Sequence, residues 1–171
     1  GDIEGLEPAR RLYHRFGIDP TRTRPSSEAL LRRVLKGESL YRINRLVDAI
    51  NWTSLAMLLP IGLYDLDHVQ GDVLIRVGRA GERFPGIRKG EVNVEARLTV
   101  ADREGAFGSP TSDSVRTAIR AETSRAMAVI FAPVDFPRAE MEEGLERMTR
   151  QVLRWCGGER NGAWILGGAR P

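Results

Sequence analysis

Hydrophobic residues in the first third of the chain repeat with the period of an α-helix. Residues 8–16 predict a short helix, and residues 26–36 predict a second one with Pro25-Ser26-Ser27 as its N-terminal cap. A third helix is expected to begin at Leu40 and to end before Pro60, because proline breaks a helix interior. The first third of the chain is therefore predicted to be helical.

The middle of the chain changes to the alternating pattern of half-buried strands. Residues 73–77 and residues 92–100 each alternate in this way, and residues 127–131 predict one more strand. Apolar side chains then return to helical spacing over residues 137–156. Residues 157–171 contain five glycines, which predicts a C-terminal tail.

Together these patterns predict an α+β protein with a strand-rich core, either a barrel or a sandwich. The N-terminal helices and the long C-terminal helix are expected to pack around that core. A length of 171 residues suits one domain. We therefore assign residues 1–156 to a single domain and residues 157–171 to its tail.

Positive charge is concentrated in one segment, although the whole chain carries a formal charge of only +3. Residues 10–45 contain ten basic and three acidic side chains, a local balance of +7. Such a surface attracts a phosphodiester backbone by releasing its counterions. The alternative is a helical surface rich in arginine that is simply solvated.

The usual motifs of catalysis and cofactor binding are absent from the sequence. It has no glycine-rich phosphate loop, no His-Glu-x-x-His helix and no Gly-x-Ser-x-Gly turn. One cysteine and two histidines leave few ligands for a metal site, so we expect no metal and no cofactor. Without an apolar run long enough to span a bilayer, or a signal peptide, the sequence favours a cytoplasmic protein with no membrane partner.

Polar residues form three clusters that are candidates for function. Asn44, Asp48 and Asn51 share one face of the third predicted helix. They either cap and brace a loop at residues 60–65, or line a ligand pocket. The second cluster centres on Glu82, an acidic residue after a turn glycine, and such residues usually belong to the turn itself.

The third cluster follows a corner rich in glycine and proline. Its members are Asp113, Ser114, Arg116, Thr117 and Thr123. This dense set of donors and acceptors is typical either of a loop site on a rigid sheet or of a loop anchored by salt bridges. His68, in contrast, is interpreted as a turn residue rather than a base.

These clusters resemble the tRNA-editing module of the bacterial phenylalanyl-tRNA synthetase beta subunit, its third and fourth B-domains, over roughly residues 10–156. The most specific stretches are residues 44–51, residues 59–67, residues 73–76 and Ala80-Gly81-Glu82. Arg24-Pro25-Ser26 and residues 113–117 look like the free-standing proteins that are built from this module alone. The chain shows nothing of the synthetase's catalytic or anticodon-contacting parts.

The resemblance implies a pocket for an aromatic-sized amino acid and hydrolysis of tyrosine wrongly attached to phenylalanine tRNA. Two positions depart from the family pattern. Gly62 stands where the synthetase has a histidine, and an apolar residue near Val129 stands where it has a glutamate. Hydrolysis without these groups still needs an oriented water and a stabilised oxyanion, and the 2′-hydroxyl of the substrate can assist.

We therefore expect a free-standing aminoacyl-tRNA editing-like protein that hydrolyses or recognises a mischarged aminoacyl-tRNA. The alternative is a non-enzymatic module that binds tRNA or an amino acid without the chemistry. The expected tRNA contacts are Arg24, Arg32 and Arg33. The candidate substrate-binding residues are Asn44, Asp48, Asn51, Asp65, Glu82, Asp113, Ser114, Arg116, Thr117 and Thr123. No catalytic residue and no oligomeric state follow from the sequence.

Overall fold

The computed structural model describes residues 3–87 and 90–167. The helices in this part of the chain are α1 (Glu7–Arg15), α2 (Ser26–Leu35), α3 (Arg45–Met57) and α4 (Arg138–Cys156). The strands are β1 (Ile61–Asp65), β2 (Leu74–Val77), β3 (Arg83–Pro85), β4 (Glu91–Asn93), β5 (Leu98–Asp102), β6 (Gly105–Ser109), β7 (Ser112–Asp113) and β8 (Ala126–Ile130). A short 3-10 helix, η1 (Leu66–His68), follows β1. The predicted α+β class is confirmed.

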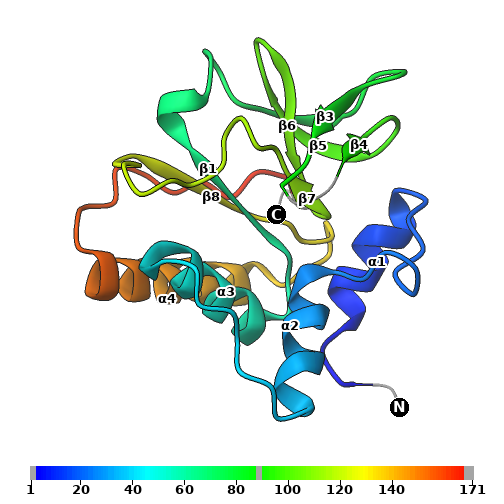
Figure 1. Ribbon diagram of the computed structural model, residues 1–171. Helices are drawn as coiled ribbons and strands as arrows, with labels where there is room; N and C mark the ends of the chain where they lie inside the picture. Colours follow the sequence, from blue (N-terminus) through cyan, green and yellow to red (C-terminus); the bar gives the residue numbers. More distant parts are fainter. Residues whose placement is uncertain (1–2, 88–89, 168–171) are drawn as a thin grey trace.

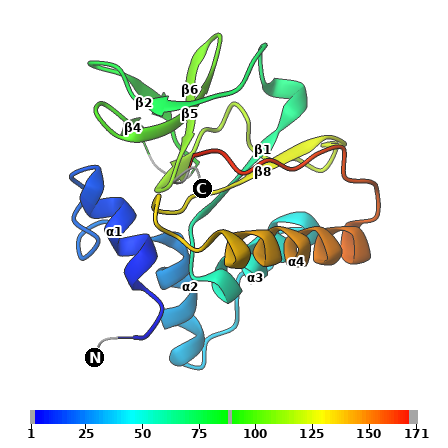
Figure 2. The same cartoon turned by 180° about the vertical axis from the view of Figure 1, so that it is seen from behind.

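The strands form antiparallel sheets above a layer of helices (Figure 1). The largest sheet has the order β2-β5-β6-β7, while β1 pairs with β8 and β3 pairs with β4. Helices α3 and α4 pack together under the β1–β8 ladder, and α1 and α2 lie to one side of it (Figures 1 and 2). Over the residues described here the sheets stay open, so the core is not a closed barrel.

The main hydrophobic core lies between α1, the β1–β8 ladder and the four-stranded sheet. Its buried side chains are Leu12, Tyr64, Val100, Phe107 and Phe131. The rings of Tyr64 and Phe107 meet edge to face, with 5.0 Å between their centroids. A smaller core beside β3 and β4 contains Phe84, Val94 and Ala106. The two cores share the four-stranded sheet, because Phe107 and Ala106 are neighbours on β6.

Three expectations about the strands need correction. Residues 92–100 form two strands rather than one, because Ala96 takes a left-handed backbone conformation (φ 55°) between β4 and β5. Residues 61–65, expected in a loop, form β1, whose side chains enter the core. The strand at 73–77 is present as β2, an edge strand, but its Leu74, Ile75 and Val77 side chains are exposed rather than half-buried.

The predicted helices are present, with a correction at the N-terminus of α3. Helix α3 begins later than expected because Asn44 is its N-cap, and its Oδ1 accepts a hydrogen bond from the Val47 N–H at 2.9 Å. Asp48 accepts another from the Ile43 N–H at 3.0 Å, and among the described residues no hydrogen bond joins Asp48 to residues 60–65. Within the predicted cap Pro25-Ser26-Ser27, the N-cap residue of α2 is Pro25, and no side chain caps the helix.

The C-terminal segment follows α4 without further regular structure. Residues 157–167 contain no helix or strand, and they run back from the end of α4 toward the β1–β8 ladder (Figure 2). The division between a domain and a tail stays a prediction. In the described ranges, no helix combines the length and the apolar character that crossing a bilayer requires.

Replacing the N-cap of α3 tests this description of the helix. Asn44→Ala removes the acceptor for the Val47 N–H and is expected to lower the free energy of unfolding by about 1 kcal/mol. Asn51→Ala on the same helix is the control, since no side-chain hydrogen bond of Asn51 is seen among the described residues. Urea unfolding of both variants checks the prediction, and an equal loss in the two would contradict it.

Candidate functional site

Gly62 and Val129, at or near which the resemblance led us to expect departures from the editing pattern, face each other in the structure. Gly62 on β1 pairs directly with Val129 on β8 in the antiparallel register. Directly opposed residues of an antiparallel pair point to the same face of the sheet. Gly62 and Val129 therefore lie side by side on one face of the ladder, and neither residue carries an ionisable group.

The side chain of Tyr64 fills the space in front of Gly62. A Cβ atom placed on Gly62 would lie 2.6 Å from the Tyr64 Cζ and even closer to its hydroxyl. A Cβ on Gly108 of β6 would also collide with the Tyr64 ring. Tyr64 is fully buried, and Val129 packs against the same core cluster. The space in front of Gly62 is thus filled by the Tyr64 ring.

Asp113 is a charged group close to this ring. Its carboxylate accepts a hydrogen bond from the Leu63 N–H at 3.3 Å, which ties β7 to β1. Burial, together with the Asp113 charge, raises the pKa of the Tyr64 hydroxyl well above its ordinary value. Tyr64 is therefore neutral at physiological pH.

Asp65 is the centre of a polar cluster at the C-terminal end of β1. Its buried carboxylate accepts hydrogen bonds from the Thr123 hydroxyl (2.7 Å) and the Asp67 N–H (3.0 Å). The Nδ1 atom of His68 lies 3.3 Å from the same carboxylate. Burial raises the pKa of Asp65, but these bonds and the imidazole outweigh that effect and hold it below its usual value. Asp65 is therefore ionised at neutral pH.

Other predicted residues belong to the same neighbourhood. The carbonyl of Thr117, a fully buried residue, accepts a hydrogen bond from the Asp65 N–H at 2.9 Å. The guanidinium group of Arg116 donates to the His68 carbonyl at 2.9 Å and makes two bonds to the Asp102 carboxylate, at 2.8 and 2.9 Å. These bonds favour an anchoring role for Arg116. Within the third cluster, Ser114 Oγ accepts from the Arg116 N–H at 3.2 Å.

The remaining predicted residues lie elsewhere. Asn44 and Asp48 cap α3 in the helical layer, and Asn51 is half-buried on the same helix. Glu82 binds both terminal nitrogens of Arg76 at 2.7 Å and accepts from the backbone N–H of Ala106 at 3.0 Å. The Arg76 bonds are the main reason why the pKa of Glu82 falls to about 2. The candidate substrate-binding residues therefore lie in three separate groups: on α3, around Asp65 and around Glu82.

The arginines of the basic segment are organised by a buried carboxylate. Glu28 is 2% exposed and accepts from Arg10 at 3.0 and 3.1 Å and from Arg32 at 2.8 Å, with Arg24 at 3.6 Å. Burial raises the pKa of Glu28, but the Arg10 and Arg32 bonds lower it by more. We call Glu28 and these three arginines the Glu28 cluster. Its formal charge is +2.

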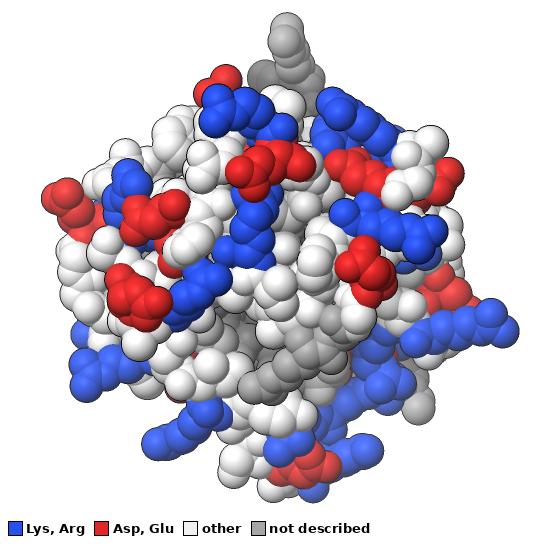
Figure 3. Space-filling view, turned by 45° about the horizontal axis from the view of Figure 1, so that its top comes forward, with Lys and Arg blue, Asp and Glu red and all other residues white. Residues whose placement is uncertain are grey.

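Arg33, the third expected tRNA contact, lies outside the Glu28 cluster. It forms an ion pair with Glu38 at 2.7 Å and stacks over the ring of Tyr41. On the face shown in Figure 3, acidic and basic side chains likewise stand next to one another. The local excess of positive charge is thus partly neutralised within the fold.

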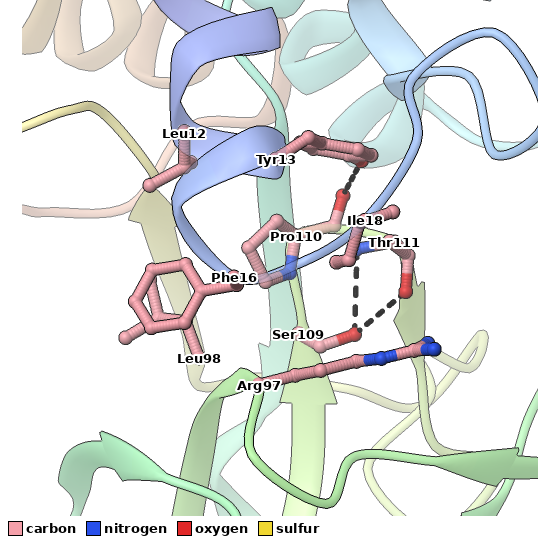
Figure 4. A pocket seen from close by; sticks show the side chains of 9 residues that line it. All are labelled: Leu12, Tyr13, Phe16, Ile18, Arg97, Leu98, Ser109, Pro110 and Thr111. Carbon is pink, nitrogen blue, oxygen red and sulfur yellow. Dashed lines mark hydrogen bonds between the residues drawn. The ribbon is translucent and has the colours of Figure 1, made fainter.

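The described structure contains a small hollow and an open groove. One lies between α1 and the segment after β6, where the Tyr13 hydroxyl donates to the Pro110 carbonyl at 2.6 Å (Figure 4). Its volume of about 10 Å³ accommodates about one water molecule. The other is an open groove of about 490 Å³ bordered by charged residues such as Arg79, Arg103 and Glu104. Neither is lined by Gly62, Val129 or Asp65.

Comparison with known proteins places the chain in a family. A family model described as the B3/4 domain matches residues 8–157, so the chain belongs to the B3/4 domain family. The phenylalanine–tRNA ligase beta subunit of Bartonella henselae is 32% identical across 85% of this chain. The same subunit of Bartonella quintana is 31% identical across 82%, and that of Anaeromyxobacter dehalogenans is 30% identical across 84%.

The match covers only part of each relative. It includes 21% of the Bartonella henselae and Bartonella quintana proteins and 18% of the Anaeromyxobacter dehalogenans protein. The chain thus spans about a fifth of the length of these relatives. What is shared is one module, which agrees with the expected resemblance to the synthetase editing module.

Adding a methyl group to Gly62 tests whether Tyr64 fills this place. Gly62→Ala is expected to lower the free energy of unfolding by about 1–3 kcal/mol, because the new Cβ overlaps the buried ring. Gly90→Ala is the matched control, since no atom lies within 4 Å of its added Cβ. Thermal or urea unfolding measures both.

A double-mutant cycle then identifies the cause of the loss. Tyr64→Leu removes the aromatic ring. In this background, Gly62→Ala is expected to lower the free energy of unfolding by less, and the difference is the coupling energy between the two positions. A cost that is the same with either side chain at position 64 would show that Tyr64 is not the obstacle.

Proposed function

We propose that this chain recognises an aminoacyl-tRNA and hydrolyses the ester bond of a mischarged one. The observation that carries the proposal is the match of residues 8–157 to the B3/4 domain model. It is supported by similar proteins that are named phenylalanine–tRNA ligase beta subunits. The resemblance to the synthetase module implies that this domain edits mischarged tRNA. The free-standing form stays a prediction, based on Arg24-Pro25-Ser26 and residues 113–117.

The Glu28 cluster supports the nucleic-acid part of the proposal. A single buried carboxylate accepts hydrogen bonds from Arg10 and Arg32 and lies 3.6 Å from Arg24, and the Arg24 and Arg32 side chains are 47% and 36% exposed. Arginines held in this way lose less side-chain entropy when they bind a phosphate, and their planar donors match phosphate oxygens. The formal charge of +2 remains available to a polyanion.

A deacylation assay over a panel of charged tRNAs tests the chemical part of the proposal. The panel contains correctly and wrongly acylated tRNAs, including tyrosine attached to phenylalanine tRNA. We expect the protein to release amino acid from one mischarged member with more than one turnover per molecule. Absence of release from every member would contradict the proposed hydrolysis.

A second candidate function is binding without chemistry. It is favoured by one observation, the filled place in front of Gly62, where neither the histidine nor the glutamate of the family pattern is present. A binding module would shift a titration with aminoacyl-tRNA or free amino acid and leave the ester intact. Titration and deacylation measured on the same preparation distinguish the two functions.

Removing one charge from the Glu28 cluster tests its role in tRNA binding. Arg24→Gln is expected to weaken tRNA binding several-fold and to reduce the slope of log K against log salt concentration by about 1. Arg24 is suited to the test because it lies farther from Glu28 than Arg10 and Arg32 do. Filter binding at salt concentrations from about 50 to about 300 mM, where phosphate contacts weaken, gives both the affinity and its salt dependence.

Arg22→Gln supplies the control. It removes the same charge two residues away, from a side chain that is 89% exposed and outside the Glu28 cluster. We expect nearly unchanged affinity and salt dependence for this variant. Equal losses in the two variants would mean that general charge, and not the Glu28 cluster, attracts the tRNA.

A further inference from the structure

His68 lies at the end of β1 in an arrangement that differs from the turn role expected for it. It ends η1, the 3-10 turn that begins beside Asp65, and its Nδ1 lies 3.3 Å from the buried Asp65 carboxylate. The imidazole itself is 43% exposed. A buried, ionised carboxylate beside a solvent-accessible imidazole is the arrangement that orients a histidine as a proton acceptor.

The Asp65 carboxylate is fixed by bonds other than its contact with His68. The Thr123 hydroxyl and the Asp67 N–H both donate to it, so its position does not depend on the imidazole. Because Nδ1 lies 3.3 Å from the carboxylate, a proton on Nδ1 is favoured, and the lone pair of the neutral ring then lies on Nε2. The structure therefore favours Nε2 as the nitrogen that accepts a proton.

Charged groups from several elements surround the imidazole. The Nη1 atom of Arg120 lies 3.3 Å from Nδ1 and 3.2 Å from Nε2, so it is aimed at neither lone pair in particular. Arg116 donates to the backbone carbonyl of His68, and its charge is balanced by Asp102. Next to the imidazole, Asp67 is paired with Arg125. Asp65 is thus the acidic group in contact with the ring, and Arg120 is the basic one.

The guanidinium group of Arg120 is held weakly. Its bonds to the carbonyls of Val115, Ala118 and Arg116 are 3.3, 3.5 and 3.5 Å long. Bonds of this length are weaker than those of Arg116 to Asp102. Arg120 can therefore turn toward an anionic oxygen beside His68 at little cost.

From this geometry we propose that His68 is the general base of ester hydrolysis in this protein, oriented by Asp65, with Arg120 stabilising the oxyanion. Nε2 takes a proton from water as the water oxygen forms a bond to the ester carbonyl carbon. The tetrahedral oxyanion collapses, the bond from that carbon to the ribose oxygen breaks, and the imidazolium returns its proton to the ribose. Water and ester are consumed, and a free amino acid and an uncharged tRNA terminus are formed.

This inference rests on the proposed hydrolysis, and the test separates the two. Single-turnover deacylation is measured with the mischarged tRNA that the panel identifies. His68→Gln is expected to slow release at least 100-fold, within the range that general-base catalysis contributes, with unchanged affinity for uncharged tRNA. His14→Gln, the same change at an exposed histidine of α1, is expected to have the wild-type rate.

A double-mutant cycle identifies the role of Asp65 as a positioning residue. Asp65→Asn is expected to slow single-turnover release in the wild-type protein, because the imidazole loses the carboxylate beside its Nδ1. If Asp65 acts through His68, the same change has no further effect on the rate in the His68→Gln protein. Affinity for uncharged tRNA, measured for both variants, is expected to stay unchanged.

Three outcomes overturn the inference. A folded His68→Gln protein with the wild-type rate removes His68 from the chemistry and leaves the proposed hydrolysis standing. An Asp65→Asn change that slows release equally in the wild-type and His68→Gln proteins removes the orienting role of Asp65. A wild type that hydrolyses no member of the panel overturns both the inference and the proposed function.

Discussion

The packing of Tyr64 between Gly62 and Gly108 joins the two main sheets of this protein. The two glycines leave room on β1 and β6, and the ring occupies that room and meets Phe107 edge to face. The β1–β8 ladder is held against the four-stranded sheet by this contact, and the α3–α4 layer covers the ladder from the other side. Any larger side chain at position 62 or 108 has to displace a fully buried ring, so these three positions constrain one another.

The helices were predictable because their signals are local. A 3.6-residue hydrophobic period and a following glycine or proline define α1, α2 and α4 from the sequence alone. The strands were harder, because a short strand is recognised by its partner as much as by its own residues. Strand β1 illustrates this, since the glycine in Ile61-Gly62-Leu63 indicates a loop until Tyr64 and β8 are placed beside it. Ala96 is similar, because its left-handed conformation interrupts a run whose alternation predicts one strand.

The candidate site was predictable only in part. Asp65 and Thr123 were both selected from the sequence, and the structure joins them by a hydrogen bond although 58 residues separate them. Asn44 and Asp48 were selected on the same grounds, and they cap a helix. A polar residue among apolar ones indicates that a buried polar group needs a partner, but it does not say whether that partner is a ligand or the backbone. His68 was passed over because its signal, the Asp-x-x-His spacing around a 3-10 turn, becomes visible when the turn geometry is known.

The same distinction between sequence and structure applies to charge. The balance of +7 over residues 10–45 treats every arginine as free, whereas Arg10, Arg24 and Arg32 share Glu28, and Arg33 is paired with Glu38. Burying Glu28 without partners would cost several kcal/mol, roughly the penalty for an unpaired buried ion, so at least one arginine must stay with it. Arg10, with two bonds, meets that requirement, and the weaker contact of Arg24 leaves its charge available. A carboxylate that neutralises one guanidinium therefore also positions two others, and a fixed pair of charges recognises a phosphate backbone better than a larger number of mobile ones.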